Sequence, residues 1–110
     1  MDLDFYQLEA HKTSKECTIG GFLLPYAAMG LAGETGELLN KIKKIYRDQE
    51  GIITDGVSQQ LQAELGDTLW YVAEIATILG LNLSDIAQEN IDTLRSRKER
   101  GKIGGSGDDR

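Results

Sequence analysis

Glu34-Thr35-Gly36-Glu37 and Glu64-Leu65-Gly66-Asp67 are two short acidic stretches, each with two carboxylates three residues apart. On an α-helix this spacing puts both side chains on one face, about one turn apart. Both stretches lie inside longer segments whose apolar residues recur with helical spacing. Four carboxylates from two packed helices would form an oxygen-only site, the kind that magnesium (Mg2+) or manganese (Mn2+) prefers. The sequence therefore predicts a helical protein built around a divalent metal site.

The rest of the chain predicts four helices and no strand. We expect the helices over about residues 3–16, 25–47, 57–79 and 84–100. Asp4, Pro25 and Ser84 suit the beginnings of the first, second and fourth helix. The predicted fold class is all-α, with a four-helix bundle-like arrangement. We expect one domain over residues 1–100, followed by a glycine-rich tail over 101–110.

Composition argues against several classes of protein. The formal net charge of −6 disfavours binding to nucleic-acid polymers or to anionic membranes. No stretch approaches the roughly 18 apolar residues of a membrane span, and the first residues lack the apolar run of a signal peptide. Cys17 is the only cysteine, so no intrachain disulfide can form, which fits a cytoplasmic location. We expect Cys17 to be a small core residue, and the only histidine, His11, to be a surface or partly buried side chain.

The acidic pairs are predicted to border the apolar interface of their helices. Glu64 shares a heptad position with Tyr71 and Ile78 and therefore points where a core residue would point. Glu34 borders the apolar stripe of its own helix. Buried carboxylates cost free energy unless they are paired or bound to metal. An acidic pair at this spacing is also common on solvated helix faces. From spacing and position alone, both interpretations stay open.

Charge neutralisation differs between the two pairs. Lys41 follows Glu37 by four residues and is expected to neutralise it. The second pair has no such lysine, and the next acid beyond it is Glu74.

Gly30, Gly33 and Gly36 fall inside the second predicted helix. Each costs roughly 1 kcal/mol relative to alanine at such a position. Close approach of a neighbouring helix, or room beside a ligand, would justify them.

The fourth predicted helix offers polar groups for an anionic ligand. Asn90, Leu94 and Arg97 recur at helical spacing and fall on one face. An amide and a guanidinium near a metal cluster suit phosphate oxygens, since arginine contacts them bidentately. An exposed basic helix end is an equal alternative.

Taken together, these residues resemble the MazG-like all-α nucleoside triphosphate pyrophosphohydrolases. The family pattern is Glu-x-x-Glu on one helix and Glu-x-x-Asp on the next, and residues 33–37 and 64–71 match its two halves. Residues 90–97 and the ending 104–110 resemble the short, phage-type members. The resemblance covers about residues 3–110.

The resemblance implies hydrolysis of a (deoxy)nucleoside triphosphate to the monophosphate and pyrophosphate, for nucleotide-pool control or housecleaning. It implies that Glu34, Glu37, Glu64 and Asp67 hold Mg2+ or Mn2+, with Glu34 or Glu37 deprotonating the attacking water. It also implies a homodimer or a dimer of dimers.

The resemblance also implies substrate-binding residues. Relatives often carry a phosphate-binding lysine where Thr93 stands here, so Arg97, Lys98 or Lys44 would have to replace it. The implied substrate-binding residues are Asn90, Arg97, Lys44, Trp70 and Tyr71. The two aromatic residues either stack on the base or pack in the core.

Two rival functions remain open at this point. One is a pyrophosphohydrolase like the enzymes that act on phosphoribosyl-ATP. The other is a non-catalytic helical interaction protein whose acids bind a structural ion.

Overall fold

The structure, a computed structural model, describes residues 1–101 and 104. This part of the chain is helical and confirms the predicted all-α class. Its helices are α1 (Leu3–His11), α2 (Leu23–Asp48), α3 (Asp55–Ile78) and α4 (Leu83–Glu99). The predicted glycine-rich tail, residues 101–110, lies almost wholly outside the described residues.

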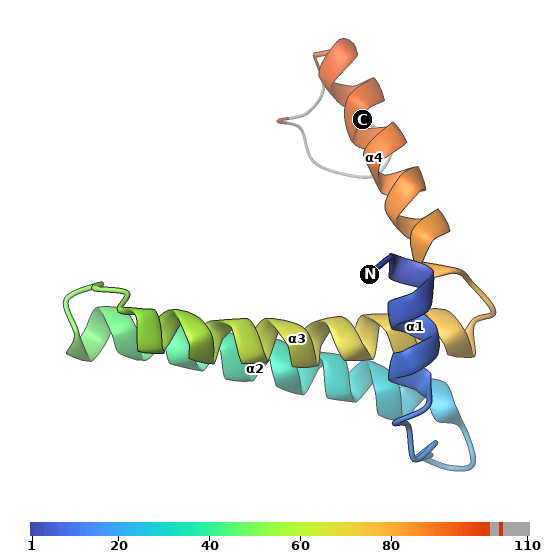
Figure 1. The fold of residues 1–110 in the computed structure, drawn as a ribbon, viewed down its shortest axis with the longest axis horizontal. Helices are drawn as coiled ribbons and strands as arrows, with labels where there is room; N and C mark the ends of the chain where they lie inside the picture. Colours follow the sequence, from blue (N-terminus) through green and yellow to red (C-terminus); the bar gives the residue numbers. More distant parts are fainter. Residues whose placement is uncertain (102–103, 105–110) are drawn as a thin grey trace.

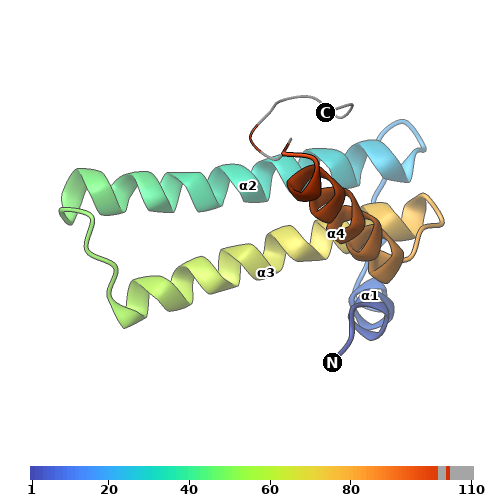
Figure 2. The same ribbon diagram turned by 90° about the horizontal axis from the view of Figure 1, so that it is seen from above.

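The two long helices, α2 and α3, run antiparallel side by side and form the frame of the molecule (Figures 1 and 2). The short helix α1 packs across the end of α3. Helix α4 is bent by 103° from α3 and packs against α1 (Figure 1). The single chain therefore differs from the predicted four-helix bundle, because its fourth helix projects away from the α2–α3 pair.

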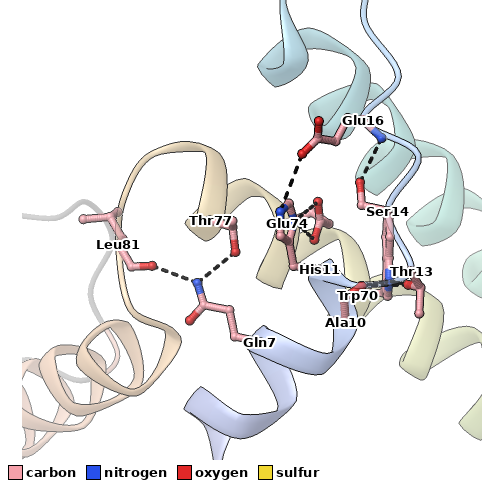
Figure 3. Close-up of polar contacts among 10 residues, drawn as sticks. All are labelled: Gln7, Ala10, His11, Thr13, Ser14, Glu16, Trp70, Glu74, Thr77 and Leu81. Atoms are coloured by element: carbon pink, nitrogen blue, oxygen red, sulfur yellow. Dashed lines mark hydrogen bonds and ion pairs between the residues drawn. The ribbon is translucent and has the colours of Figure 1, made fainter.

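Gln7 on α1 determines where α4 begins. Its Nε2 donates to Thr77 Oγ1 at 3.1 Å and to the Leu81 carbonyl oxygen at 2.8 Å (Figure 3). Its Oε1 accepts a hydrogen bond from the Leu83 N–H at 2.7 Å. The first turn of a helix has N–H groups without partners in the helix, and here a buried side chain from another helix satisfies one of them.

Two predicted helix caps are wrong for this reason. Ser84 lies inside α4, where its N–H and hydroxyl donate to the two carboxylate oxygens of Asp4 at 3.2 and 2.8 Å. Asp4 is thus occupied by α4, and α1 is capped by Asp2, which accepts from the Phe5 N–H at 2.7 Å. For α4, these partners come from a distant helix and leave no local sequence signal.

The first helix ends at His11 rather than near residue 16. The Thr13 hydroxyl donates to the Ala10 carbonyl oxygen at 2.7 Å, and the indole N–H of Trp70 donates to the same carbonyl and to Thr13 Oγ1 (Figure 3). These bonds hold the end of α1 against α3. The following segment includes Glu16 at φ 51°, which is not a right-handed helical conformation.

The core is made of few and mostly small side chains. Its buried apolar residues are Ala10, Ala27, Ile45, Ala73, Ala76 and Leu83. A Cβ at Gly30 would overlap the ring of Tyr71, so glycine there permits the close approach of α2 and α3. A Cβ at Gly33 or Gly36 would meet no atom within 4 Å, so packing does not account for these two glycines.

Some apolar residues are not covered by this core. Cys17, predicted to be a core residue, is exposed because it lies in the irregular segment between α1 and α2.

Among the described residues, none of the four helices alone combines the length and apolar character that crossing a membrane requires.

Candidate functional site

Three of the four predicted metal ligands lie together at the α2–α3 interface. Glu34 on α2, with Glu64 and Asp67 on α3, each contribute a carboxylate oxygen to a group whose members lie within 4.8 Å of one another. Glu64 is 8% exposed, Glu34 is half-buried and Asp67 is exposed. The acidic cluster, as we call these three residues, therefore has a buried base and an open side.

The fourth predicted ligand, Glu37, lies one turn along α2 from Glu34 and is exposed. It is not part of the close oxygen group. Its charge still acts on the cluster. The pKa of Glu34 is raised, first by burial and then by the negative charges of Asp67, Glu64 and Glu37. A bound cation would remove this repulsion among the carboxylates.

Lys41 pairs with a different acid from the one predicted. Its Nζ lies 3.1 Å from Glu64 Oε1 on α3, not beside Glu37 on its own helix. The side chain reaches across because Glu64 lies inside the interface between the two helices. The other oxygen of that carboxylate, Oε2, is buried and has no hydrogen-bond partner among the described residues.

A buried carboxylate oxygen without a partner is costly, and a cation is its natural ligand. The donor set also fits a hard divalent ion, because the acidic cluster offers only oxygen ligands. The residues present therefore fit the metal that the sequence predicts. No metal identity follows from the oxygens alone.

Trp70 and Tyr71 lie directly beside the acidic cluster. A cavity of about 320 Å³ is lined by Glu34, Asp67 and these two aromatic residues. Both aromatic side chains are half-buried, and their rings meet edge to face with centroids 4.9 Å apart. They are therefore neither fully buried core residues nor free surface residues.

A second cavity of about 200 Å³ continues on the other side of the same aromatic residues. Trp70 and Tyr71 also line this cavity, together with residues of α1, the following segment, α2 and α3. At its wall His11 Nδ1 lies 3.1 and 3.3 Å from the two oxygens of Glu74, and His11 Nε2 lies 3.6 Å from Glu16 Oε1 (Figure 3). Glu74 is only 4% exposed.

Sequence reasoning missed this second polar group. His11 was expected as a surface or partly buried side chain, and it is half-buried, but its contact with Glu74 joins residues 63 positions apart. One local signal was present: Glu74 follows Asp67 by seven residues and so lies on the same side of α3 as the acidic cluster.

The other predicted substrate-binding residues lie apart from the acidic cluster in the single chain. Asn90 is exposed and Arg97 half-buried on α4, which packs against α1. Lys44 is exposed and lines a separate cavity of about 140 Å³ with Lys41, between α2 and α3. The cavity at the cluster is lined by α2 and α3 residues.

Comparisons with known proteins identify the family of this chain. The MazG nucleotide pyrophosphohydrolase domain matches residues 26–101, which span α2 to α4 and include both acidic pairs. The Gene 37 protein of Mycobacterium phage L5 is 49% identical over 116 aligned residues, with the whole of both chains covered. No solved structure matches the chain. Proteins with this domain are metal-dependent, and the acidic cluster could hold such a metal. On its domain match and its paired carboxylates, the chain belongs to the MazG nucleotide pyrophosphohydrolase family.

Proposed function

We propose that this protein hydrolyses a (deoxy)nucleoside triphosphate to the monophosphate and pyrophosphate, in nucleotide-pool control or housecleaning. One observation carries the proposal: three carboxylate oxygens from two helices lie within 4.8 Å of one another, in a chain of this family. Such a cluster repels itself unless a cation binds, and a cation there can bind a triphosphate.

Glu34, Glu64 and Asp67 would hold the metal, which we propose to be Mg2+, with Mn2+ as a substitute. The buried, unpartnered Oε2 of Glu64 supports this assignment. The bound ion would supply charge neutralisation along the phosphate chain and for the leaving pyrophosphate. Lys41, already 3.1 Å from Glu64, adds a positive charge at the same place.

Glu37 is the carboxylate best suited to the attacking water, because it lies beside the cluster but outside its close oxygen group. It would orient the water and accept its proton. The water oxygen forms a bond to the α-phosphorus. The bond from that phosphorus to the bridging oxygen breaks, and its electron pair leaves with pyrophosphate.

The rest of the nucleotide would lie along α3. Trp70 and Tyr71 separate the cavity at the acidic cluster from the second cavity, so they can contact the nucleoside while its phosphates are at the cluster. Asn90, Arg97 and Lys44 are proposed to contact phosphate oxygens. For Asn90 and Arg97, this requires α4 to approach the acidic cluster of a second copy.

A homodimer would supply that approach. The chain exposes 7952 Å², whereas a compact protein of its mass exposes roughly 6,000 Å². The excess is of the size that obligate dimers bury. Apolar side chains line a notch of about 550 Å³ between α1, α3 and α4, among them Leu3, Leu69 and Ile91. We propose that a second copy covers this notch and brings α4 of one copy against the α2–α3 pair of the other.

Product analysis tests the proposal. The protein is incubated with Mg2+ and a panel of nucleotides, including phosphoribosyl-ATP, and the products are separated by chromatography. A phosphate assay is run with and without added pyrophosphatase. We expect monophosphate and pyrophosphate without accumulating diphosphate. Metal binding with no turnover on any nucleotide would contradict the proposal and favour the interaction protein.

Variants sharpen this experiment. Asp67→Asn and Glu37→Ala should lower turnover by orders of magnitude, because one removes a metal ligand and the other the group that holds the water. Asp55→Asn, on the exposed first turn of the same helix α3, is the matched control and should keep activity. Arg97→Ala should in addition weaken substrate binding.

A further inference from the structure

We propose that the second cavity binds the nucleobase and that Glu74 makes it selective for guanine. The inference rests on the proposed function, because it names the nucleotide that the same site takes. It is carried by the place of the cavity, the rigidity of its walls and the burial of one carboxylate.

The cavity lies where the base of a bound nucleotide would be. It shares Trp70 and Tyr71 with the cavity at the acidic cluster, so the two spaces adjoin. Asp67 and Glu74 are seven residues apart on α3, which is two turns and about 10.5 Å along the helix. The two carboxylates thus lie on the same side of α3, separated by about the reach from an α-phosphate to the far edge of a base.

The walls suit a flat ring. The cavity of about 200 Å³ is far larger than the roughly 10–15 Å³ that one water needs. Tyr26, Trp70 and Tyr71 contribute aromatic surface to it. The indole of Trp70 is fixed by hydrogen bonds to the Ala10 carbonyl at 3.2 Å and to Thr13 Oγ1 at 2.8 Å, so this wall is rigid.

Glu74 is the polar group that such a base would meet. It lines the cavity and is 4% exposed, and among the described residues both of its oxygens contact one ring nitrogen, His11 Nδ1. An ionised carboxylate has about four acceptor positions. The contact with His11 leaves some of these positions for a ligand that donates hydrogen bonds.

The geometry of a carboxylate points to guanine among the common bases. Guanine presents two adjacent donors, the N1–H and the 2-amino group, which can each meet one carboxylate oxygen. Adenine and cytosine present an amino group next to a ring nitrogen acceptor, and thymine presents one N–H between two carbonyls. With these bases at least one oxygen of Glu74 would face an acceptor, which binding sites of this kind reject.

The test that needs no variant compares dGTP with dITP, which differs only by lacking the 2-amino group. With wild-type protein and Mg2+, kcat/KM is measured for dGTP, dITP, dATP, dCTP and dTTP. A bidentate contact predicts a value for dGTP about tenfold to a hundredfold above that for dITP and for the other three. Equal values for dGTP and dITP, or a preference for another base, would overturn the inference and leave the proposed hydrolysis standing.

A variant tests whether Glu74 is the side chain responsible for this selectivity. Glu74→Gln keeps the size but replaces one acceptor by a donor, so the ratio of dGTP to dITP should fall at least tenfold. Glu50→Gln, an exposed change in the α2–α3 loop, is the control and should keep the wild-type ratio. A melting curve establishes that the variant is folded; if it is not, the dGTP and dITP comparison decides. An unchanged ratio in folded Glu74→Gln would overturn the assignment to Glu74.

A binding measurement separates this inference from the proposed hydrolysis. Trp70 is the only tryptophan and lines the cavity, so its fluorescence reports on a base that enters it. Without metal, GMP should quench this fluorescence at about tenfold lower concentration than IMP. If no triphosphate is hydrolysed but this difference is present, the proposed function fails and the base site stands. If GMP and IMP quench alike, the base site is overturned.

Discussion

Glu64 is a carboxylate where helix packing would normally place an apolar side chain. Its direction followed from the sequence, because it shares a heptad position with Tyr71 and Ile78. Its partner did not, because Lys41 reaches Glu64 only through the relative rotation of α2 and α3. The two oxygens of Glu64 have opposite surroundings: one meets a lysine, and the other is buried without a partner among the described residues.

At this scale we predict how metal changes stability. Mg2+ should raise the melting temperature of the wild type, because the cation relieves repulsion in the acidic cluster. The gain should shrink in Glu64→Gln and in Asp67→Asn, each of which removes one ligand charge. Differential scanning fluorimetry with and without Mg2+ measures it, with Asp55→Asn as the control that keeps the full gain. A full gain in both cluster variants would place the metal elsewhere.

The contact between Glu74 and His11 could not be predicted from sequence spacing alone. The position of Glu74 on α3 was readable from the sequence, but its contact with His11 depends on how α1 crosses α3. That crossing is held by Trp70, whose two hydrogen bonds join α3 to residues about 60 positions away. The residues proposed to hold the metal were predictable because their spacing is local, and the residues proposed to bind the base were not because their contacts are distant.

Helices α2 and α3 were predicted to within two residues at each end, because long periodic segments carry a strong signal. Their close approach beside Tyr71, however, requires glycine at position 30. The ring of Tyr71 occupies the space that a Cβ at Gly30 would need, whereas Gly33 faces open space.

These two glycines give a matched prediction. Gly30→Ala should lower the free energy of unfolding by about 1–3 kcal/mol, because the new methyl group forces the Tyr71 ring and the helices apart. Gly33→Ala should raise it by up to about 1 kcal/mol through helix propensity alone. Urea denaturation followed by circular dichroism measures both. Equal effects of the two substitutions would show that α2 and α3 do not pack closely at Gly30.

Helix α4 is positioned by side chains of α1 rather than by its own sequence. Gln7 satisfies the Leu83 N–H and the Leu81 carbonyl, and it is buried. Neither contact is visible in the local sequence around residue 83, which is why the predicted cap at Ser84 was wrong.

Removal of this side chain should therefore release α4. Gln7→Ala is expected to lower the free energy of unfolding by about 1–3 kcal/mol, since it leaves buried backbone groups without partners. Hydrogen exchange should show faster exchange in the first turn of α4 than in α2. Gln59→Ala, on the exposed surface of α3, is the control. Unchanged exchange in α4 would mean that Gln7 does not hold the helix.

The whole molecule is open for its size. Its radius of gyration is 16.9 Å, whereas a compact chain of 110 residues has about 13 Å. The all-α class was predictable from periodicity, but the projection of α4 was not, because it depends on contacts with α1 and leaves apolar surface uncovered. Large side chains on both helices are exposed, such as Phe5 at 49% and Ile91 at 42%, and the proposed second copy would cover such surface.

At this scale we predict a homodimer in solution. Size-exclusion chromatography with light scattering should give twice the chain mass at micromolar concentration. Ile91→Glu should shift the protein toward monomer and lower its activity, because a charge in the notch opposes burial. Ile53→Glu, in the exposed α2–α3 loop, should leave the mass unchanged. A stable, active wild-type monomer at this concentration would contradict the proposed assembly.

The position of water attack tests the proposed reaction most directly. The nucleoside triphosphate is hydrolysed with Mg2+ in water enriched in oxygen-18, and the products are weighed by mass spectrometry. Attack at the α-phosphorus, held between the acidic cluster and the water on Glu37, predicts one labelled oxygen in the monophosphate and none in pyrophosphate. Label in the pyrophosphate, or labelled orthophosphate with nucleoside diphosphate, would contradict the proposed reaction.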